Sequence, residues 1–291
     1  MTNPTTKYTS EPFKEQRQEW PALQRNMDPV PDCGEKSYRG SNRLAGRKAL
    51  VTGGDSGIGR AAVIAFAREG ADVAINYFPS EEPDAQDVAE LVRAAGRKAI
   101  LIPGDLTDQQ FCLDLVERAH RELGGIDILV NNAAYQQSKV SIADISFEQF
   151  DRTLKTNLYA MFWITKTALP LMKPGAAIIN TASVNSFNPG EELLDYATTK
   201  GGIAIFTKGL AKQLAKKGIR VNAVAPGPVW TPLQVAGGQL PGKLNEFGQD
   251  TPIGRAGQPA ELAPLFVLLA SGEITYTDGS VFGANGGTGA I

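Results

Sequence analysis

Histidine and cysteine are scarce in this sequence. Its 291 residues include one histidine, His120, and two cysteines, Cys33 and Cys112. Zinc sites take their ligands from histidine, cysteine and carboxylate side chains. These three residues lie far apart and in no metal-ligand spacing, so we expect no metal site. Two thiols in a chain of this length also argue against a disulfide framework and indicate a reducing compartment.

Long apolar runs and an excess of one charge are missing too. No apolar run approaches the roughly 18 residues of a membrane-spanning helix, and the polar segment 1–10 lacks the apolar core of a secretory signal. The 29 basic and 31 acidic residues give a net charge of −2, which provides no general attraction to nucleic acid or anionic membranes. We therefore expect a cytoplasmic protein that acts on a small molecule and binds neither nucleic acid nor membrane.

The first 46 residues differ in composition from the rest of the chain. They contain five of the 18 prolines and only two alanines, and they show no helical or strand periodicity. Their scattered aromatic residues are unusual for a disordered tail. One interpretation is a flexible extension. The other, which we prefer from about Trp20 onward, is an ordered arm that lays Trp20 and Tyr38 on the globular body or on a neighbouring subunit. The predicted organisation is an arm, 1–46, followed by one globular domain, 47–291.

From residue 47 onward, short apolar runs alternate with segments of helical periodicity. This alternation predicts parallel strands joined by right-handed crossovers, with helices on both faces of the sheet. The fold class is therefore α/β, a doubly wound, Rossmann-type domain, in which ligands bind at the carboxyl ends of the strands. The expected strands are 49–52, 72–76, 98–102, 126–130, 176–180, 220–225 and 280–282, and the expected helices are 58–69, 84–95, 108–123, 147–172, 195–216 and 260–270.

A glycine-rich turn follows the first expected strand. It reads Thr52-Gly-Gly-Asp-Ser-Gly-Ile-Gly-Arg60, so Gly53, Gly57 and Gly59 have the spacing Gly-x3-Gly-x-Gly. Glycines let the chain turn tightly and approach a pyrophosphate, which then binds the amides at the start of the next helix. Because the spacing differs from the general Gly-x-Gly-x-x-Gly fingerprint, a merely tight strand-to-helix turn is the alternative interpretation.

A tyrosine and a lysine four residues apart form a second motif. Tyr196 and Lys200 lie on the same face of an expected helix, and Ser183 follows the preceding strand. A phenol with a pKa near 10 is a poor acid–base group at neutral pH, but a neighbouring cation favours the phenolate. A serine hydroxyl can hydrogen-bond a substrate carbonyl or alcohol. The combination with the glycine-rich turn makes a chance pair of residues an unsatisfactory explanation.

These motifs resemble those of the short-chain dehydrogenase/reductase family, from about Leu44 to the carboxyl terminus. The family's Asn-Asn-Ala-Gly segment is similar to Asn131–Ala134, and its Pro-Gly-x3-Thr loop is similar to Pro226–Thr231. Ala134 departs from the family's glycine and puts a methyl group near the ribose side of the cofactor. The first residues, with Trp20-Pro21 and the segment 31–36, further resemble a bacterial subgroup described as glucose/ribitol-dehydrogenase-like or as general-stress oxidoreductases.

The resemblance implies an oxidoreductase that transfers a hydride between a nicotinamide cofactor and a small alcohol or carbonyl compound. It implies that Tyr196 is the general acid/base and that Lys200 lowers its pKa and binds the nicotinamide ribose. Ser183 would orient the reacting oxygen, and Asn157 would support a water-linked proton relay. The cofactor-binding residues that it implies are Gly53, Asp55, Ser56, Gly57, Ile58, Gly59, Asn76, Tyr77, Asp105, Leu106, Asn132, Ala133, Tyr196, Lys200, Pro226, Gly227, Val229 and Thr231.

The sequence contains fewer signals for the choice of cofactor and substrate. NAD pairs with an acidic residue near its ribose and NADP with a basic one. The second strand ends with neither, and Asp55 would repel a phosphate, so we favour NAD over NADP. A glycine- and proline-rich loop, about 229–250, is expected to act as a mobile lid over the substrate. The residues expected to line the substrate pocket are Gln136, Asn185, Phe187 and Trp230. Their mixture suits a sugar, polyol, secondary alcohol or ketone.

Two other functions stay open. One is a redox sensor that binds NAD(P) without catalysis, although such a protein would be expected to lose the Tyr–Lys pair. The other is an NADPH-dependent 3-oxoacyl-thioester reductase, which should carry a basic docking patch. The resemblance also implies a homo-oligomer, commonly a tetramer.

Overall fold

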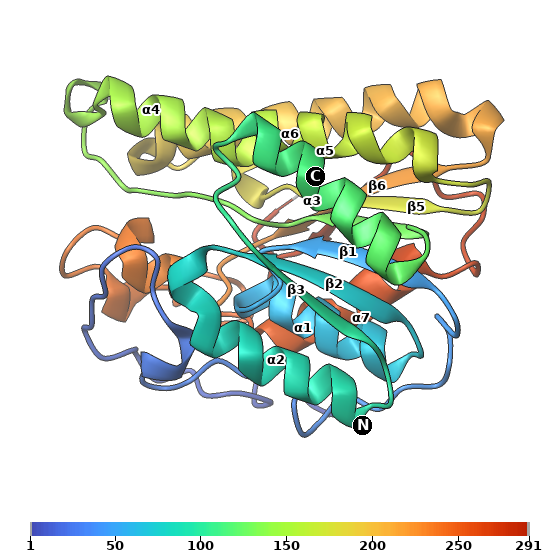
Figure 1. The fold of residues 1–291 in the computed structure, drawn as a ribbon. Coiled ribbons are helices and arrows are strands. Elements are labelled where there is room, and N and C mark those ends of the chain that lie inside the picture. Colours follow the sequence, from blue (N-terminus) through green and yellow to red (C-terminus); the bar gives the residue numbers. More distant parts are fainter. Residues whose placement is uncertain (1, 290–291) are drawn as a thin grey trace.

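The protein was studied as a computed structural model, which describes residues 2–289. Seven strands form one parallel sheet in the order β3-β2-β1-β4-β5-β6-β7 (Figure 1). The strands are β1 Lys48–Thr52, β2 Asp72–Tyr77, β3 Ala99–Pro103, β4 Ile128–Asn131, β5 Ala177–Thr181, β6 Arg220–Pro226 and β7 Val281–Ala284. β1, β4, β5 and β6 are buried almost throughout, as parallel strands covered on both faces must be.

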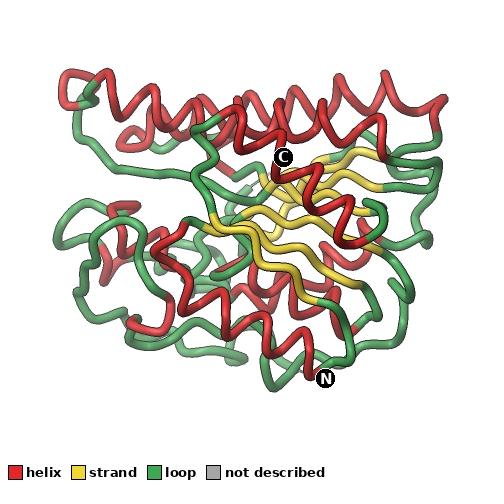
Figure 2. The backbone as a smooth tube through the Cα atoms, in the orientation of Figure 1, coloured by secondary structure: helices red, strands yellow, loops and turns green. Residues whose placement is uncertain are grey.

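Helices cover both faces of the sheet, as Figures 1 and 2 show. In these views α1, α2 and α7 lie below the sheet, and α3, α4, α5 and α6 lie above it. The helices are α1 Gly57–Arg68, α2 Glu82–Ala94, α3 Gln109–Leu123, α4 Phe147–Leu154, α5 Ala160–Ala168, α6 Leu194–Leu214 and α7 Pro259–Ala270. The predicted doubly wound α/β fold is confirmed.

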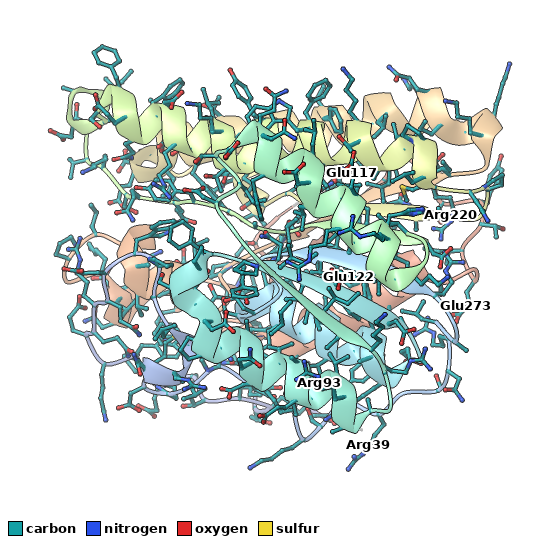
Figure 3. All side chains as sticks on the ribbon, in the orientation of Figure 1. Arg39, Arg93, Glu117, Glu122, Arg220 and Glu273 are labelled. Carbon is teal, nitrogen blue, oxygen red and sulfur yellow. The ribbon has the colours of Figure 1, made fainter. Side chains whose placement is uncertain are left out.

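Each face of the sheet has its own apolar core. Alternate residues of β1 illustrate the division: Val51 packs with α1 and α7 below the sheet, whereas Leu50 packs with α3 above it. Charged residues project from the outer sides of both layers, for example Arg93 on α2 and Glu117 on α3 (Figure 3). Among residues 2–289, no helix combines the length and the apolarity that crossing a membrane requires.

One expected helix is interrupted. The segment 147–172 was predicted as continuous, but a π-helical turn, Lys155–Tyr159, separates α4 from α5, and a 3-10 turn, Leu169–Leu171, follows α5. A π-turn accommodates an extra residue within a helix and is common at functional sites. Here it carries the buried Asn157, whose amide group bonds to a neighbouring loop and to α6. The prediction of one continuous helix did not include this insertion.

The amino-terminal segment lies along the body of the protein. In Figure 1 its dark blue chain runs beside the orange segment that follows β6. Tyr38 donates a hydrogen bond from its hydroxyl to Glu69 Oε1 at 2.6 Å. Trp20 packs edge-on against Phe78, with ring centroids 4.7 Å apart. The two aromatic residues that were expected to anchor an ordered arm therefore both contact the globular part of the same chain.

Candidate active site

The strand order reverses between β1 and β4, and a cleft opens at the carboxyl ends of these strands. Including its open mouth, the cleft measures about 1170 Å³. Such a reversal is where doubly wound sheets bind nucleotides. Seventeen of the eighteen residues expected to bind a cofactor line the cleft: Gly53, Asp55, Ser56, Gly57, Ile58, Asn76, Tyr77, Asp105, Leu106, Asn132, Ala133, Tyr196, Lys200, Pro226, Gly227, Val229 and Thr231.

Gly59 is the exception, and the structure corrects its expected position. It does not line the cleft but packs beneath the glycine-rich turn. A Cβ atom at Gly59 would lie 1.8 Å from the carbonyl oxygen of Gly53 and 2.6 Å from Asn132 Nδ2. The residue therefore lets the first turn of α1 approach the end of β1, rather than contacting a ligand.

The segment after β4 holds the glycine-rich turn in place. Asn132 donates from Nδ2 to the carbonyl oxygen of Gly53 at 3.0 Å. The Oγ1 atom of Thr52 accepts hydrogen bonds from the amides of Asn132 at 3.0 Å and Ala133 at 3.2 Å. These contacts join the two loops on either side of the strand reversal. The methyl group of Ala134 also faces the cleft.

Tyr196 and Lys200 are buried side by side on α6. The Lys200 Nζ atom lies 5.3 Å from the centre of the Tyr196 ring and donates to the carbonyl oxygen of Thr181 at 2.7 Å. Ser183, at the end of the neighbouring strand β5, accepts hydrogen bonds through Oγ from the amide of Asn185 at 3.1 Å. The expected spacing thus brings the phenol, the ammonium group and the hydroxyl to one wall of the cleft.

The pKa values of Tyr196 and Lys200 differ from the expectation that the lysine lowers the pKa of the phenol. Burial raises the pKa of Tyr196 to about 12, and the neighbouring Ser183 hydroxyl opposes part of this shift. Burial also lowers the pKa of Lys200 to about 7. Because desolvation disfavours the charged form of both groups, Lys200 by itself does not bring the phenol into the neutral range.

Asn157 is held tightly by its side chain. Its Oδ1 atom accepts from the amide of Tyr135 at 2.7 Å, and its Nδ2 atom donates to the Tyr135 carbonyl and to Thr199 Oγ1, both at 3.0 Å. The side-chain amide therefore joins the π-turn to the loop after β4 and to α6. Both of its N–H donors are used in these contacts, which leaves the main-chain carbonyl as a further acceptor.

A second cavity adjoins the cleft, and Ser183 and Tyr196 line both. Of the expected substrate residues, Gln136 and Asn185 line this second cavity. Most of its other side chains are polar or charged: Glu192, Gln234, Gln239, Lys243, Glu246 and Asp250. The only lysine among them is paired, because Lys243 Nζ lies 2.8 Å from Glu246 Oε2. The cavity is therefore polar and carries more negative than positive charge.

The other two expected substrate residues lie elsewhere. Trp230 is 0% exposed, its ring stacks on Phe13 at a centroid distance of 3.8 Å, and its Nε1 atom donates to the Pro29 carbonyl at 2.7 Å. Phe187 is exposed near Lys208 and lines neither cavity. Both predictions were wrong because the arm supplies an apolar partner for Trp230 and because the turn after Ser183 points Phe187 outward.

Acidic groups gather beside the end of β2. Asp55 is 1% exposed, and neither of its carboxylate oxygens has a hydrogen-bond partner within residues 2–289. Burial raises the pKa of Asp55, and burial together with the charge of Asp55 raises the pKa of Glu81. The nearby Arg60 is engaged by Glu35, since its Nε atom lies 2.8 Å from Glu35 Oε1.

The arm also contributes to the cleft, which was not expected. Trp20, Pro21 and Ala22 line it together with the glycine-rich turn. Phe78 and Glu81, just beyond β2, were also missed. The Trp20-Pro21 pair was recognised as part of an ordered arm, but no local pattern tells where an irregular segment docks.

The cleft meets the requirements of a dinucleotide. Its turn leaves no room for a side chain at Gly57, where a Cβ atom would lie 2.9 Å from Thr231 Cγ2, and Gly57 also has a positive φ of 50°. The unpartnered carboxylate of Asp55 offers acceptors for ribose hydroxyl groups. Within the described chain, no group of three or more His, Cys, Asp or Glu residues could hold a metal ion.

Comparison with known proteins supports this interpretation. Residues 53–289 match a family described as Enoyl-(Acyl carrier protein) reductase. The chain is 58% identical to the uncharacterized oxidoreductase YhxD of Bacillus subtilis over 99% of its own length and 97% of that protein's. It is 43% identical to the glucose and ribitol dehydrogenase homolog of Oryza sativa, covering 96% of this chain and 98% of that protein. It is 44% identical to the NADPH-dependent aldehyde reductase 1 of Arabidopsis thaliana, covering 94% and 97%.

Solved structures with a similar fold support the same family. A short chain dehydrogenase from Burkholderia cenocepacia, crystallised in complex with NADP, superposes with a TM-score of 0.80 at 34% identity. The match covers 85% of this chain and all of that one. The segment outside the match is of about the length of the arm. With the family match, the high identities and the shared fold, the chain belongs to the short-chain dehydrogenase/reductase family of oxidoreductases.

Proposed function

We propose that this protein transfers a hydride between a nicotinamide dinucleotide in the cleft and a small, uncharged, polyhydroxylated alcohol or carbonyl compound in the adjoining cavity. The observation that carries the proposal is that Ser183 and Tyr196 line both spaces. A substrate oxygen bound to these two side chains would place its carbon at the boundary between the spaces. When bound, the nicotinamide ring supplies or accepts the hydride.

The residues around this boundary would bind the substrate and the cofactor and transfer the proton. Ser183 would hold the reacting oxygen, and Tyr196 would give that oxygen a proton during reduction or take one from it during oxidation. Lys200 would fix the nicotinamide ribose, with its ammonium group oriented by the Thr181 carbonyl. Because the Asn157 side chain is occupied, a water held on its main-chain carbonyl would link Lys200 to solvent. A positive charge on the oxidised ring would help to stabilise the phenolate.

The polar cavity supports a sugar, polyol or hydroxyaldehyde as substrate. Its glutamine and asparagine side chains can donate to and accept from several hydroxyl groups, whereas its carboxylates would repel an acyl-thioester carrier, which is anionic. The names of the rice and Arabidopsis relatives point to the same class of compound.

We also propose that residues 1–46 form an arm and that residues 229–250 cover the substrate. The two buried free cysteines support a further proposal, that the protein works in a reducing cytoplasm.

An activity screen tests the proposed substrate class. Purified protein should oxidise NADH or NADPH in the presence of neutral aldoses or glyceraldehyde. In the reverse direction it should reduce NAD or NADP in the presence of ribitol and related polyols. Turnover with acetoacetyl-thioesters should be at least about tenfold lower in kcat/KM. A preference for the thioester would support the acyl-thioester reductase, and tight dinucleotide binding without turnover of any of these compounds would support the redox sensor.

Dinucleotide preference should depend on pH. The NADP complex of the Burkholderia relative supports a nicotinamide cofactor but gives no support to a fixed preference for NAD. We propose that this chain accepts both, and that the raised pKa values of Asp55 and Glu81 set the balance. At low pH the two carboxyls are neutral and tolerate a 2′-phosphate. As the pH rises they ionise and repel it, so the preference for NADH should grow.

Binding titrations from about pH 6 to about pH 9 check this expectation. In the wild type, the ratio of the NADPH to the NADH dissociation constant should rise with pH by about tenfold, equivalent to about 1.4 kcal/mol. The Asp55→Asn variant, which cannot ionise, should flatten the rise. An equally steep rise in the variant would mean that ionisation of Asp55 does not control the preference.

A homo-oligomer is the proposed assembly. Apolar side chains project from the outer face of α4, α5 and α6, including Phe147, which is 92% exposed, and Ile205, which is 69% exposed. Phe162, on α5, is 48% exposed. Such a patch is typical of an interface, and a second copy of the chain could cover it. Light scattering should give a multiple of 31.0 kDa for the wild type and a lower mass for Phe162→Glu. A monomeric wild type would exclude this assembly.

A further inference from the structure

We propose that the arm is part of the dinucleotide site: Trp20, Pro21 and Ala22 close its adenosine end and contact the adenine base. The inference deepens the proposed function and rests on it, because it assumes that the cleft holds a nicotinamide dinucleotide. It assigns binding residues to a segment outside the part of the chain matched by the family.

The position of Trp20 identifies the end of the cleft that the arm covers. In doubly wound folds the adenosine ribose lies near the end of the second strand. Trp20 packs against Phe78, immediately after β2, and both residues line the cleft. The guanidinium of Arg152 also contacts Trp20, 4.1 Å from the ring centre. Arg152 in turn pairs with Asp105 at 3.3 Å, beyond β3.

This geometry points to the base rather than to the nicotinamide. Asp105 and Leu106, which follow β3, line the same cleft as Trp20. Arg152 therefore links Trp20 of the arm to Asp105 of the loop after β3, and both of these residues line the cleft. The apolar surfaces of a tryptophan, a proline and an alanine suit a flat, weakly polar ring, whereas a phosphate would need donors. Adenine is the part of the dinucleotide with that chemistry.

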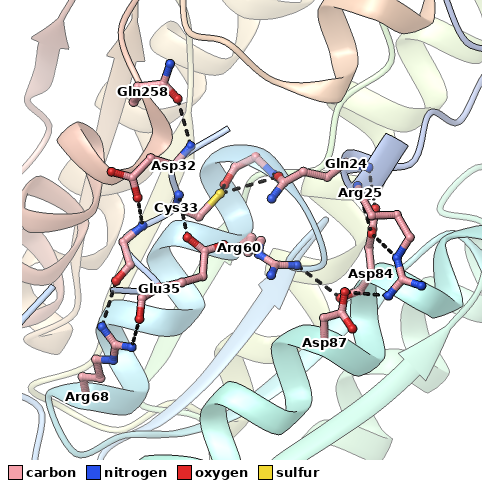
Figure 4. Close-up of polar contacts among 12 residues, drawn as sticks. Gln24, Arg25, Asp32, Cys33, Glu35, Arg60, Arg68, Asp84, Asp87 and Gln258 are labelled. Carbon is pink, nitrogen blue, oxygen red and sulfur yellow. Dashed lines mark hydrogen bonds and ion pairs between the residues drawn. The ribbon is translucent and has the colours of Figure 1, made fainter. Parts of the chain in front are cut away.

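The arm is attached directly to the glycine-rich turn through Gln24, which Figure 4 shows beside Cys33 and Asp84. Gln24, just beyond Ala22, is 2% exposed and accepts through Oε1 from the amide of Gly57 at 2.8 Å. The main-chain amide of Gln24 donates to Asp84 Oδ2 at 2.6 Å. Cys33 also donates from Sγ to Gln24 Oε1 at 3.5 Å. A buried glutamine thus fixes the arm to the loop that would bind the pyrophosphate.

Earlier in the chain, the arm is also attached to the segment that follows β6. Phe13 stacks on Trp230 with an interplanar angle of 6°. The amide of Gln18 donates to the Val235 carbonyl at 3.0 Å, and the amide of Gly242 donates to Glu15 Oε1 at 3.1 Å. Trp20 lies between these two attachments in sequence. The segment is therefore held across the cleft at both ends, which a freely moving tail would not be.

Binding of half-cofactors to Trp20 variants tests the inference. ADP contains the adenine end, and nicotinamide mononucleotide contains the other end. Calorimetry should show ADP and NADH binding to Trp20→Ala about tenfold more weakly than to the wild type, the order of a base–aromatic contact. Nicotinamide mononucleotide should bind both proteins equally. Lys14→Ala, which removes an exposed arm ion pair away from the cleft, should match the wild type throughout.

A conservative variant guards against a simple folding defect. Trp20→Phe keeps an aromatic ring, so ADP should bind it nearly as tightly as the wild type. The chain has three tryptophans, and ADP should quench the fluorescence of the wild type and of Trp163→Phe but not of Trp20→Phe.

Two results would overturn the inference, and they are distinguishable. Equal ADP affinities of wild type and Trp20→Ala, with quenching retained in Trp20→Phe, would remove the arm from the site but leave the proposed function intact. Failure of the wild type to bind ADP, NADH or NADPH would reject the proposed function and the inference together.

Discussion

Replacing Tyr196 with phenylalanine is expected to lower kcat for both oxidation and reduction by about 10²–10⁴-fold, the usual contribution of general acid–base catalysis. The substitution removes one oxygen atom from a buried ring at the boundary of the two cavities. The ring keeps its packing, so the dissociation constant for NADH should change less than about threefold. A large loss of turnover with unchanged cofactor binding would be the signature of a missing proton donor.

The pH dependence of the wild type should follow from the same residue. Oxidation needs the Tyr196 phenolate, and burial raises the pKa of this phenol to about 12. The rate of alcohol oxidation should therefore keep rising with pH through the alkaline range. Reduction needs the protonated phenol, which is present at neutral pH, so its rate should change little there. In the Tyr196→Phe variant, the residual rate of alcohol oxidation should not rise with pH in the alkaline range.

Tyr276→Phe is the matched control for this experiment. Tyr276 is fully exposed, at 103% relative accessibility, so loss of its hydroxyl should alter neither kcat nor its pH dependence. The assigned role of Tyr196 would be wrong if both tyrosine variants turned over substrate at the rate of the wild type.

The second large effect is expected from Gly59→Ala. The new methyl group would lie 1.8 Å from the Gly53 carbonyl oxygen, a distance at which the backbone must move. The movement would displace the turn that carries Asp55 and Gly57, and overpacking of this kind costs about 1–3 kcal/mol. We expect a lower Tm and a loss of NADH affinity of at least about 30-fold.

Gly209→Ala provides the control within the same chain. Gly209 lies in α6, and a Cβ atom there would have nothing within 4 Å. Alanine favours a helix interior by about 1 kcal/mol over glycine, so this variant should melt slightly higher and bind NADH normally. Equal NADH affinities for Gly59→Ala and Gly209→Ala would show that the turn tolerates displacement and does not hold the nucleotide.

The fold and much of the cleft could be predicted because their signals are local. Apolar runs separated by helical periods define the strands, and the carboxyl ends of parallel strands meet at one edge. The turn at Gly53 and the helix with Tyr196 each follow a recognisable spacing, so they reach the same cleft as soon as the sheet forms. The position of Gly59 below the cleft was missed because spacing alone does not separate a glycine that contacts a ligand from one that permits packing.

The remaining errors depend on contacts between distant segments. Trp230 was expected in the substrate pocket, but Phe13, more than 200 residues earlier, covers its ring. The arm's part in the cleft has the same origin, since Trp20 meets Arg152 and Phe78 only in the folded chain. Irregular segments have no periodicity that points to a docking surface. The π-turn around Asn157 has a different origin, since it lies within a segment for which one continuous helix was predicted.

Isotope transfer offers the most direct test of the proposed chemistry. The wild type would be incubated with an aldose or glyceraldehyde and with NADH or NADPH that carries deuterium in both positions at C4 of the nicotinamide, and the product would be analysed by mass spectrometry. One deuterium atom per molecule on the former carbonyl carbon is the predicted result, with Tyr196→Phe giving far less product. Alcohol formed without deuterium, or no alcohol from any neutral carbonyl compound although the dinucleotide binds, would contradict hydride transfer at this site.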